Sequence, residues 1–144
     1  MPKTELVARI DGGARGNPGP AAYGVIVGTA DGKPIARLSE FLGEATNNEA
    51  EYAALLAALE YAIHHRARSL KVFSDSELLV RQMGGEYKVK SDHLKPLFQQ
   101  AQGLTARLES FSIAHVPREQ NREADRLVNK ILDAHRDASS RLVR

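Results

Sequence analysis

The sequence contains the stretch IDGGARGNPGP at Ile10–Pro20, in which four glycines and two prolines follow a single acidic residue. It begins at the end of an alternating segment, Glu5–Asp11, that predicts a β-strand, and a second predicted strand, Tyr23–Thr29, follows it. Glycine and proline at these positions predict a turn between the two strands. A turn does not need an acid at the end of an apolar run, and Asp11 is therefore a candidate for chemistry.

The remainder of the chain alternates between strand-like and helix-like patterns. Asp31-Gly32 predicts a hairpin turn into a third strand, so that three antiparallel strands begin the fold. The third strand and the later segments are Pro34–Phe41, a helix from Thr46 to about Ile63, strand Ser69–Asp75, short helix Glu77–Met83, helix Asp92–Leu108, strand Phe111–Val116 and helix Asn121–His135. This order predicts an α/β fold with a five-stranded mixed sheet flanked by helices. We expect one domain, residues 1–137, and a flexible C-terminal tail, residues 138–144.

The composition, with 42% hydrophobic and 26% charged residues in a chain of 144, is that of a soluble globular protein. The absence of cysteine excludes a disulfide framework, a thiolate nucleophile and a zinc–thiolate site. No apolar run is long enough to span a membrane, and the start lacks the apolar core of a signal peptide, so we expect a cytoplasmic protein without membrane contacts. The formal net charge of +2 favours a polyanionic partner only weakly, because solvated lysines and arginines explain it more simply.

Two aspartates, Asp11 and Asp75, each end a short apolar strand, in the segments ARID and KVFSD. If these strands are neighbours, both carboxylates emerge at the same edge of the sheet, where sites form in open α/β sheets. Burying an acid at such a position is costly unless it has a partner. For either aspartate alone, a turn or helix-cap role is an equally good interpretation.

Two further acids lie on predicted helices. Thr46 and Glu49 have the spacing of a capping box, but Asn48 and Glu51 could also form the cap pair, which leaves the frame of the helix start open. Glu51 heads an apolar stripe of its helix, and it lies either at the rim of the core or facing a site. Asp125 lies in the first turn of the last helix, where the helix dipole alone favours an acid.

The four acids would form a site only if the fold brought their elements together. Clustered carboxylates repel one another unless cations neutralise them, and hard oxygen ligands suit Mg²⁺ or Mn²⁺. Two such ions about 4 Å apart can activate a water and stabilise a leaving oxygen in phosphodiester cleavage. Spacing along the sequence does not show whether the four acids converge.

Four segments in order carry a resemblance to a known family: IDGGARGNPGP (10–20), TNNEAEY (46–52), VFSDSELLVRQM (72–83) and VPREQNREADRLVN (116–129). Together they resemble the motifs of type 1 ribonuclease H, over roughly residues 5–135. The resemblance implies the ribonuclease H-like fold and Mg²⁺-dependent endonucleolytic hydrolysis of the RNA strand of RNA/DNA hybrids, with Mn²⁺ able to substitute. It also implies a compact form, without a basic handle and without an N-terminal hybrid-binding domain.

By this resemblance, Asp11, Glu51, Asp75 and Asp125 are the catalytic carboxylates and metal ligands of a two-metal-ion mechanism that leaves 5′-phosphate and 3′-hydroxyl ends. Asp11 would bridge both metals, and Asp125 would hold the nucleophile-side metal with it. Glu51 and Asp75 would complete the shell of the other metal. The resemblance also assigns Glu49 to the helix cap and Glu51 to catalysis.

Substrate contacts are implied in the same way. RNA differs from DNA in its 2′-hydroxyls, which short polar side chains and a closely approaching backbone can recognise in the minor groove. Thr46 is expected to contact a DNA-strand phosphate as well as cap its helix, and for Asn47 and Asn48 we expect both capping and ligand contact. The matching substrate-binding positions are Gly12, Gly13, Asn17, Asn47, Asn48 and Ser76.

Three features depart from the family pattern. Glu77 stands where many members carry a glutamine, and an acid there would weaken a phosphate contact unless its side chain turns away. The segment before the last helix lacks the histidine of many members, and Arg118 is the nearest group that could attract or release the leaving phosphate, although a guanidinium is no general acid. His115 lies within a strand and is expected to be structural. Without a tryptophan-containing handle, Lys88 and Lys90 supply at most a reduced phosphate-binding surface, and simple solvation explains them equally well.

Two alternatives remain open. Another nuclease of the same superfamily, such as a junction resolvase or a transposase core, would use the same acids, but the asparagine pair and the GNPG turn match hybrid readers. A catalytically inactive hybrid-binding or structural module would be expected to lack one of the four acids. We therefore expect an active, monomeric ribonuclease H whose partner is an RNA/DNA hybrid, with duplex RNA as a second candidate, and whose affinity falls steeply with salt.

Overall fold

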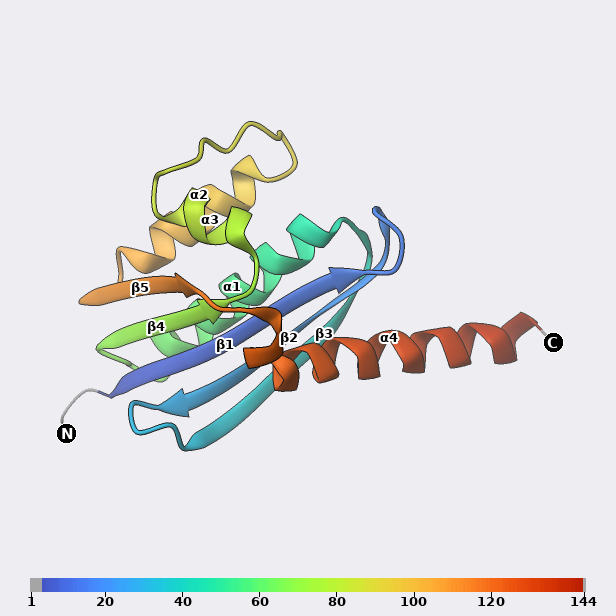
Figure 1. Ribbon diagram of the computed structural model, residues 1–144, viewed down its shortest axis with the longest axis horizontal. Coiled ribbons are helices and arrows are strands. Elements are labelled where there is room, and N and C mark those ends of the chain that lie inside the picture. The colour runs from blue at the N-terminus through green and yellow to red at the C-terminus, as the bar shows by residue number, and fades with distance from the viewer. Residues whose placement is uncertain (1–3, 144) are drawn as a thin grey trace.

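The computed structural model describes residues 4–143, and its element order is the one that the sequence predicts (Figure 1). A short 3₁₀ turn, η1, precedes the last helix. The bounds of the elements are β1 Glu5–Ala14, β2 Gly19–Thr29, β3 Pro34–Ala45, α1 Asn47–His64, β4 Ser69–Ser74, α2 Glu77–Met83, α3 Lys95–Thr105, β5 Ser110–His115, η1 Arg118–Gln120 and α4 Arg122–Val143.

The strands form one sheet in the order β3-β2-β1-β4-β5. β1 pairs antiparallel with β2, and β2 pairs antiparallel with β3, whereas β4 runs parallel to both of its neighbours, β1 and β5. The prediction of a five-stranded mixed sheet that begins with three antiparallel strands is confirmed. Because β1 and β4 are parallel neighbours, the end of β4 at Ser74 lies beside Ile10 of β1, which continues past it to Ala14.

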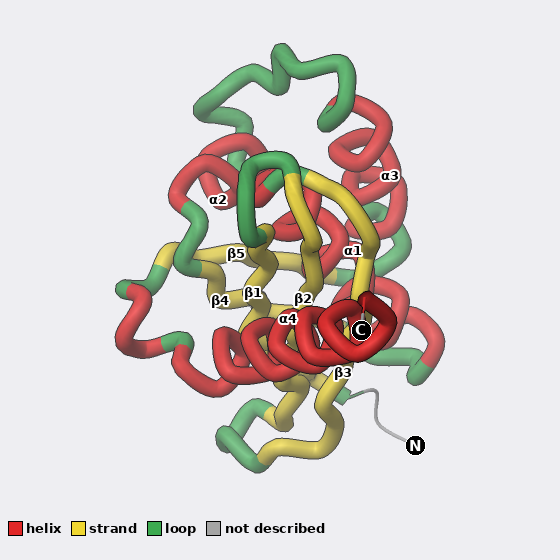
Figure 2. The backbone as a smooth tube through the Cα atoms, turned by 90° about the vertical axis from the view of Figure 1, so that its right-hand side faces the viewer, coloured by secondary structure: helices red, strands yellow, loops and turns green. Residues whose placement is uncertain are grey.

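Helices cover both faces of the sheet (Figures 1 and 2). α1 packs on β1 and β2, and α3 packs on α1, so the main core lies on this side and includes the fully buried Ile10, Leu55 and Val72. α4 crosses the opposite face over β2. It approaches so closely that a Cβ on Gly24 would lie 2.6 Å from the backbone oxygen of Ala124, and only glycine permits this packing.

The start of α1 shows which acid caps the helix. The Thr46 hydroxyl accepts from the Glu49 N–H at 3.1 Å, and the Glu49 carboxylate accepts from the Thr46 N–H at 2.9 Å. This capping box excludes the alternative pair of Asn48 and Glu51. Asn47 and Asn48 are the first two residues of the helix, so the expectation that they cap it is wrong. With this frame, Glu51 lies on the inward side of α1.

The segment Ile10–Pro20 is less of a turn than the sequence predicts. β1 continues through Ala14 and β2 already begins at Gly19, so the connection is only residues 15–18. Pattern analysis assigns glycine to a turn by default, but Gly12 lies within the strand, where it allows α1 to approach. The prediction that Gly12 belongs to a turn is therefore wrong, because Gly12 lies in β1 and its lack of a side chain makes room for α1.

Several helix bounds also differ from the prediction, including the end of α3, which lies at Thr105 instead of Leu108. α3 begins at Lys95 instead of Asp92, and Pro96 then lies in the first turn, where a missing N–H is tolerated. α4 does not end at His135 but continues to Val143, and its last turns extend beyond the sheet (Figure 1). It passes residue 137 without a break, and the division of the chain at that point stays a prediction. Within residues 4–143, no helix has the length and apolarity needed to cross a membrane.

Tyr52→Phe is expected to lower the free energy of unfolding by about 1–2 kcal/mol. Tyr52 is fully buried in α1, and its hydroxyl donates to the carboxamide oxygen of buried Gln82 in α2 at 2.7 Å. The variant leaves that acceptor without a partner in the core. Urea denaturation followed by circular dichroism measures the loss. Tyr23→Phe, which removes an exposed bond to Glu40, is the control and should change stability by less than about 0.5 kcal/mol. Equal effects of the two variants would contradict the prediction.

Candidate active site

Asp11 and Asp75 are neighbours in space, although Asp11 lies within β1, which continues to Ala14, and not at a strand end as the sequence predicts. In the parallel register of β1 and β4, Ile10 pairs with Ser74, and Asp11 and Asp75 are the next residues of the two segments. The condition on which the sequence argument depended, that these two strands are adjacent, is therefore met. Asp11 pairs with Gly24 of β2 and is only 8% exposed. Its carboxylate lies on the face of the sheet that α4 covers.

Glu51 reaches the same place from the helix layer. It is 6% exposed, and its Oε1 accepts a hydrogen bond from the backbone N–H of Gly12. The contact depends on the close packing of α1 against β1, because a Cβ on residue 12 would lie 2.2 Å from the backbone carbon of Ala50. Gly12 thus allows the approach that brings Glu51 beside Asp11.

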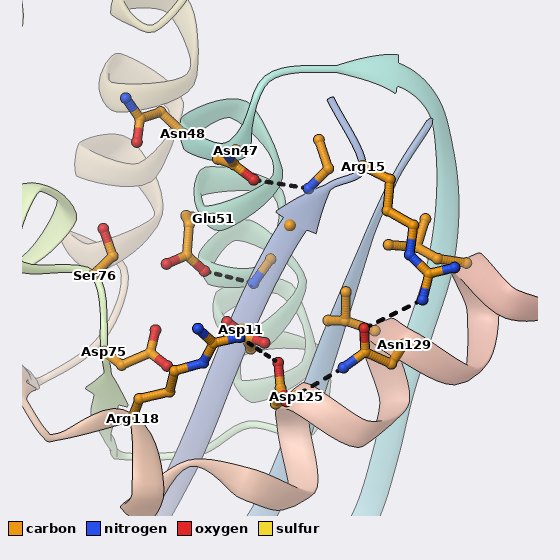
Figure 3. Close-up of a pocket in the computed structure, with 15 residues that line it drawn as sticks. Asp11, Arg15, Asn47, Asn48, Glu51, Asp75, Ser76, Arg118, Asp125 and Asn129 are labelled. Atoms are coloured by element: carbon orange, nitrogen blue, oxygen red, sulfur yellow. Dashed lines mark hydrogen bonds and ion pairs between the residues drawn. The ribbon is translucent and has the colours of Figure 1, made fainter. Parts of the chain in front are cut away.

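Asp11, Glu51 and Asp75 form one acidic cluster, in which an oxygen of each carboxylate lies within 4.8 Å of the other two (Figure 3). Burial, followed by the charges of Asp75 and Asp125, raises the pKa of Asp11 to about 8. Burial and the neighbouring acids also raise the pKa of Glu51 well above its usual value, and burial raises that of Asp75. A cation bound among the three carboxylates would favour the ionised form of each of them.

Asp125 adds a fourth carboxylate from α4. Its side chain is 31% exposed and lies beside Asp11, whose pKa it raises by charge and by hydrogen bonding. Arg118, at the start of η1, approaches from the other side, with its Nη2 3.8 Å from Asp125 Oδ1. The Arg118 charge also lowers the pKa of Asp75. The guanidinium is 79% exposed, so it stands at the rim of the cluster and is open to solvent.

The carboxylates fit a hard divalent cation. Every donor in the cluster is an oxygen, which Mg²⁺ and Mn²⁺ prefer, and the donors are carried by two strands and a helix. The carboxylates of the cluster are buried close together, so their ionised forms repel one another. A bound cation would offset that repulsion. The arrangement is therefore suited to holding a metal ion.

The acids lie in a cleft together with most of the predicted substrate-contact residues. Asn17 and Asn47 form hydrogen bonds that connect the segments around the cleft. Asn47 Oδ1 accepts from the Ala14 N–H at 2.8 Å, and Asn17 Oδ1 accepts from the Asn47 N–H at 3.0 Å. These bonds fix the 15–18 turn against the start of α1. The predicted contact residues that line the cleft are Gly12, Gly13, Asn47, Asn48 and Ser76.

Other predicted residues lie outside the cleft lining. The Thr46 hydroxyl is occupied by the helix cap, and Lys88 and Lys90 are exposed on the α2–α3 connection. Glu77 is paired with Arg81 at 2.8 Å and is not among the residues that line the cleft. Substrate contacts by these residues stay predictions.

Several residues near the acids are not identified by the sequence analysis. Asn121 is 1% exposed, and its Nδ2 donates to the Ile10 carbonyl at 2.7 Å, which fixes the end of η1 to β1. Arg15 and Asn129 line the cleft near Asp125. Only the four-residue spacing between Asp125 and Asn129 on one helix could have pointed to a contact. His115, expected to be structural, lies at the exposed end of β5 and lowers the pKa of Asp75.

The fold and the cleft together define a class of protein, the ribonuclease H-like domains with an acidic site at two parallel neighbouring strands. The chain matches the reverse transcriptase-like family over residues 9–131. It superposes on the N-terminal ribonuclease H domain of Rv2228c from Mycobacterium tuberculosis with a TM-score of 0.91 at 43% identity, over 95% of this chain and 99% of that one. It superposes on LC11-RNase H1, solved in complex with an RNA/DNA hybrid, with a TM-score of 0.83 at 42% identity, over 87% and 94% of the two chains. The chain belongs to the type 1 ribonuclease H family.

Two curated relatives agree with this assignment. The bifunctional protein Rv2228c of Mycobacterium tuberculosis is 45% identical over 90% of this chain, and ribonuclease HI of Halobacterium salinarum is 40% identical over 88% of it. The chain spans 36% of the length of the first relative and 63% of the second. The resemblance inferred from the four sequence motifs is confirmed.

Proposed function

We propose that the chain is a metal-dependent endoribonuclease that hydrolyses the RNA strand of RNA/DNA hybrids and leaves 5′-phosphate and 3′-hydroxyl ends. The observation that carries the proposal is the cluster of Asp11, Glu51 and Asp75, with carboxylate oxygens within 4.8 Å of one another in an open cleft. The hybrid bound to LC11-RNase H1 and the name of the Halobacterium relative support this choice of substrate.

The positions of the side chains support the catalytic roles that we propose for them. Asp11, Glu51, Asp75 and Asp125 would hold two Mg²⁺ ions, or Mn²⁺ in their place. When bound, such ions supply an activated water and charge stabilisation for phosphodiester hydrolysis. The chain keeps the carboxylates in register, because β1 and β4 fix Asp11 and Asp75 while the Gly12 N–H holds Glu51. Arg118 is placed to attract the departing phosphate, and it binds this group without protonating it, because a guanidinium stays charged.

The cleft also offers groups that suit the minor groove of a hybrid. Gly13 presents backbone without a side chain, and Asn48 and Ser76 add an amide and a hydroxyl, whereas the N–H of Gly12 in the same cleft is already bonded to Glu51. Such groups can hydrogen-bond to the 2′-hydroxyls that distinguish RNA from DNA. We expect the protein to act as a monomer in the cytoplasm, with duplex RNA as a second candidate substrate.

One cleavage assay tests the function. End-labelled RNA/DNA hybrid, duplex RNA, duplex DNA and a four-way junction are incubated with the protein in Mg²⁺, in Mn²⁺ and in EDTA. We expect internal cleavage of the RNA in the hybrid, with either metal, and none in EDTA. Preferential cutting of the junction would instead favour a resolvase. Folded protein that cuts nothing in either metal would refute the proposal.

A further inference from the structure

The Asp125 carboxylate is more exposed than those of Asp11 and Glu51. Asp11 and Glu51 are buried within the three-acid cluster, whereas the Asp125 side chain is 31% exposed on α4. Its two oxygens meet two different donors. Arg118 Nη2 lies 3.8 Å from Oδ1, and Asn129 Nδ2 donates to Oδ2 at 3.3 Å. The direction of this carboxylate therefore depends on side chains outside the cluster.

Asn129 is itself held at its other end. Its Oδ1 accepts a hydrogen bond from Arg15 Nη2 at 3.4 Å. An asparagine amide has one accepting and one donating end. With the Arg15 guanidinium at the oxygen, the NH₂ group is directed at Asp125. The reversed amide would place its oxygen against the carboxylate and its NH₂ against the guanidinium, and both contacts would be repulsive.

Arg15 connects this arrangement to the strand that carries Asp11. It follows directly after β1, and its Nη2 lies 2.7 Å from Asp133 Oδ1 (Figure 3 shows the Arg15–Asn129–Asp125 part). Asp125, Asn129 and Asp133 follow one another at intervals of four residues on α4, so they form one stripe along the helix. Arg15 therefore binds two successive positions of that stripe, and through Asn129 it acts on the third.

We infer that Arg15 and Asn129 are positioning residues that hold the Asp125 carboxylate toward Asp11. In this position the carboxylate of α4 and the three-acid cluster can act together as one set of metal ligands. The inference rests on the proposed function for the role of Asp125 in cleavage. The hydrogen bonds themselves, and the binding of a cation by the acids, can be measured without a substrate.

The first test compares Asn129→Ala and Arg15→Ala with the wild-type protein. Mn²⁺ binding is measured by titration calorimetry without nucleic acid, and kcat and KM are measured on a hybrid. For Asn129→Ala we expect the Mn²⁺ affinity and kcat each to fall by about 10-fold, because hydrogen-bond partners of metal ligands typically contribute at least this much, with KM unchanged. Arg15→Lys should be intermediate, because an ammonium keeps the charge beside Asp133 but does not reproduce the geometry in which the guanidinium Nη2 contacts both Asp133 and Asn129.

The Arg15→Ala/Asn129→Ala double variant distinguishes this inference from a direct substrate contact. If Arg15 acts through Asn129, the double variant should match Asn129→Ala alone, because neighbouring residues in one network are not additive. Arg37→Ala is the matched control, since it removes another exposed arginine contact to α4, the 3.5 Å pair with Glu123, and should change neither quantity.

Three results would overturn the inference. Unchanged Mn²⁺ affinity in Asn129→Ala would show that Asn129 does not position Asp125. Fully additive losses, or a higher KM for Arg15→Ala with unaltered Mn²⁺ affinity, would show that Arg15 contacts the substrate directly. Failure of the proposed function is distinguishable from all three, because a wild-type protein that binds Mn²⁺ but cuts no hybrid still allows the calorimetric comparison.

Discussion

Asp11→Asn should reduce hybrid cleavage by about 1,000-fold or more while the protein stays folded, because a metal site supplies several kcal/mol of transition-state stabilisation. Asp11 lies in one cluster with Glu51 and Asp75, and Asp125 lies beside it on the other side. The amide keeps the shape of the side chain but removes the negative charge of Asp11, which lies between the Glu51–Asp75 pair and Asp125. A near-isosteric change at a strand position should leave the sheet intact.

The same substitution should raise stability when no metal is present. The pKa of Asp11 is 3.8 as an unperturbed group and about 8 in the fold, so between these pH values the folded state retains a proton that the unfolded state has lost. The free energy of unfolding therefore falls as the pH rises from about 4 to about 8. Because asparagine does not titrate, the Asp11→Asn variant lacks this contribution to the fall in the free energy of unfolding. In EDTA the variant should melt above the wild type at pH 8, and the difference should shrink toward pH 4.

Cleavage rates and melting temperatures at several pH values test both parts of this prediction. Added Mg²⁺ should raise the melting temperature of the wild type more than that of the variant, because binding stabilises only a state that holds the ion. Asp92→Asn, which removes an exposed carboxylate paired with Lys95, is the control and should behave as the wild type. Full activity of Asp11→Asn, or a lower melting temperature than the wild type in EDTA at pH 8, would contradict the assignment of Asp11.

Gly12→Ala should destabilise the protein by about 3 kcal/mol or more, and it should also impair the site. The added methyl group would lie 2.2 Å from the Ala50 backbone carbon, 2.3 Å from its oxygen and 2.5 Å from the Glu51 nitrogen. These atoms belong to the backbone of α1 and cannot rotate away, so the helix must shift off β1. Glu51 would shift with it and lose its hydrogen bond from the residue 12 N–H.

Urea denaturation measures the stability of the Gly12 variant, and Mn²⁺ calorimetry at low temperature measures its metal site. Gly103→Ala is a matched control with the opposite expected sign. A Cβ there meets no atom within 4 Å, and alanine in the interior of α3 should stabilise by about 0.5–1 kcal/mol. If Gly12→Ala is as stable as the wild type and binds Mn²⁺ equally well, the close approach of α1 is not what places Glu51.

Local patterns were sufficient to predict most of the elements. Alternation identified the strands, but the capping patterns left two possible starts for α1, and the capping box of Thr46 and Glu49 in the structure decided between them. The chain also places an acid at the end of each of two apolar segments, and this position distinguishes Asp11 and Asp75 from the acids on helix surfaces and in turns. These signals are readable because each depends on residues two to four positions apart.

The contacts that support Asp125 carried almost no sequence signal. Arg15 precedes Asn129 by more than a hundred residues, and an exposed arginine in a glycine-rich turn has nothing to distinguish it. Asn121 resembles an ordinary residue before a helix, yet it is buried and bonded to the Ile10 carbonyl. Such contacts become visible only when the segments are placed in space.

The sequence by itself determined the order of the elements and the four candidate acids, because propensity and periodicity act over a few neighbouring residues, whereas the cap of α1 was decided by the structure. The tertiary structure decided that β1 and β4 are parallel neighbours, that α1 lies directly on Gly12, and that Arg15 reaches Asn129 across the cleft. Sheet register and helix packing join residues from distant segments, and their energies depend on the shape of the whole core. The acids could therefore be chosen from the sequence, but their convergence could not be derived from it.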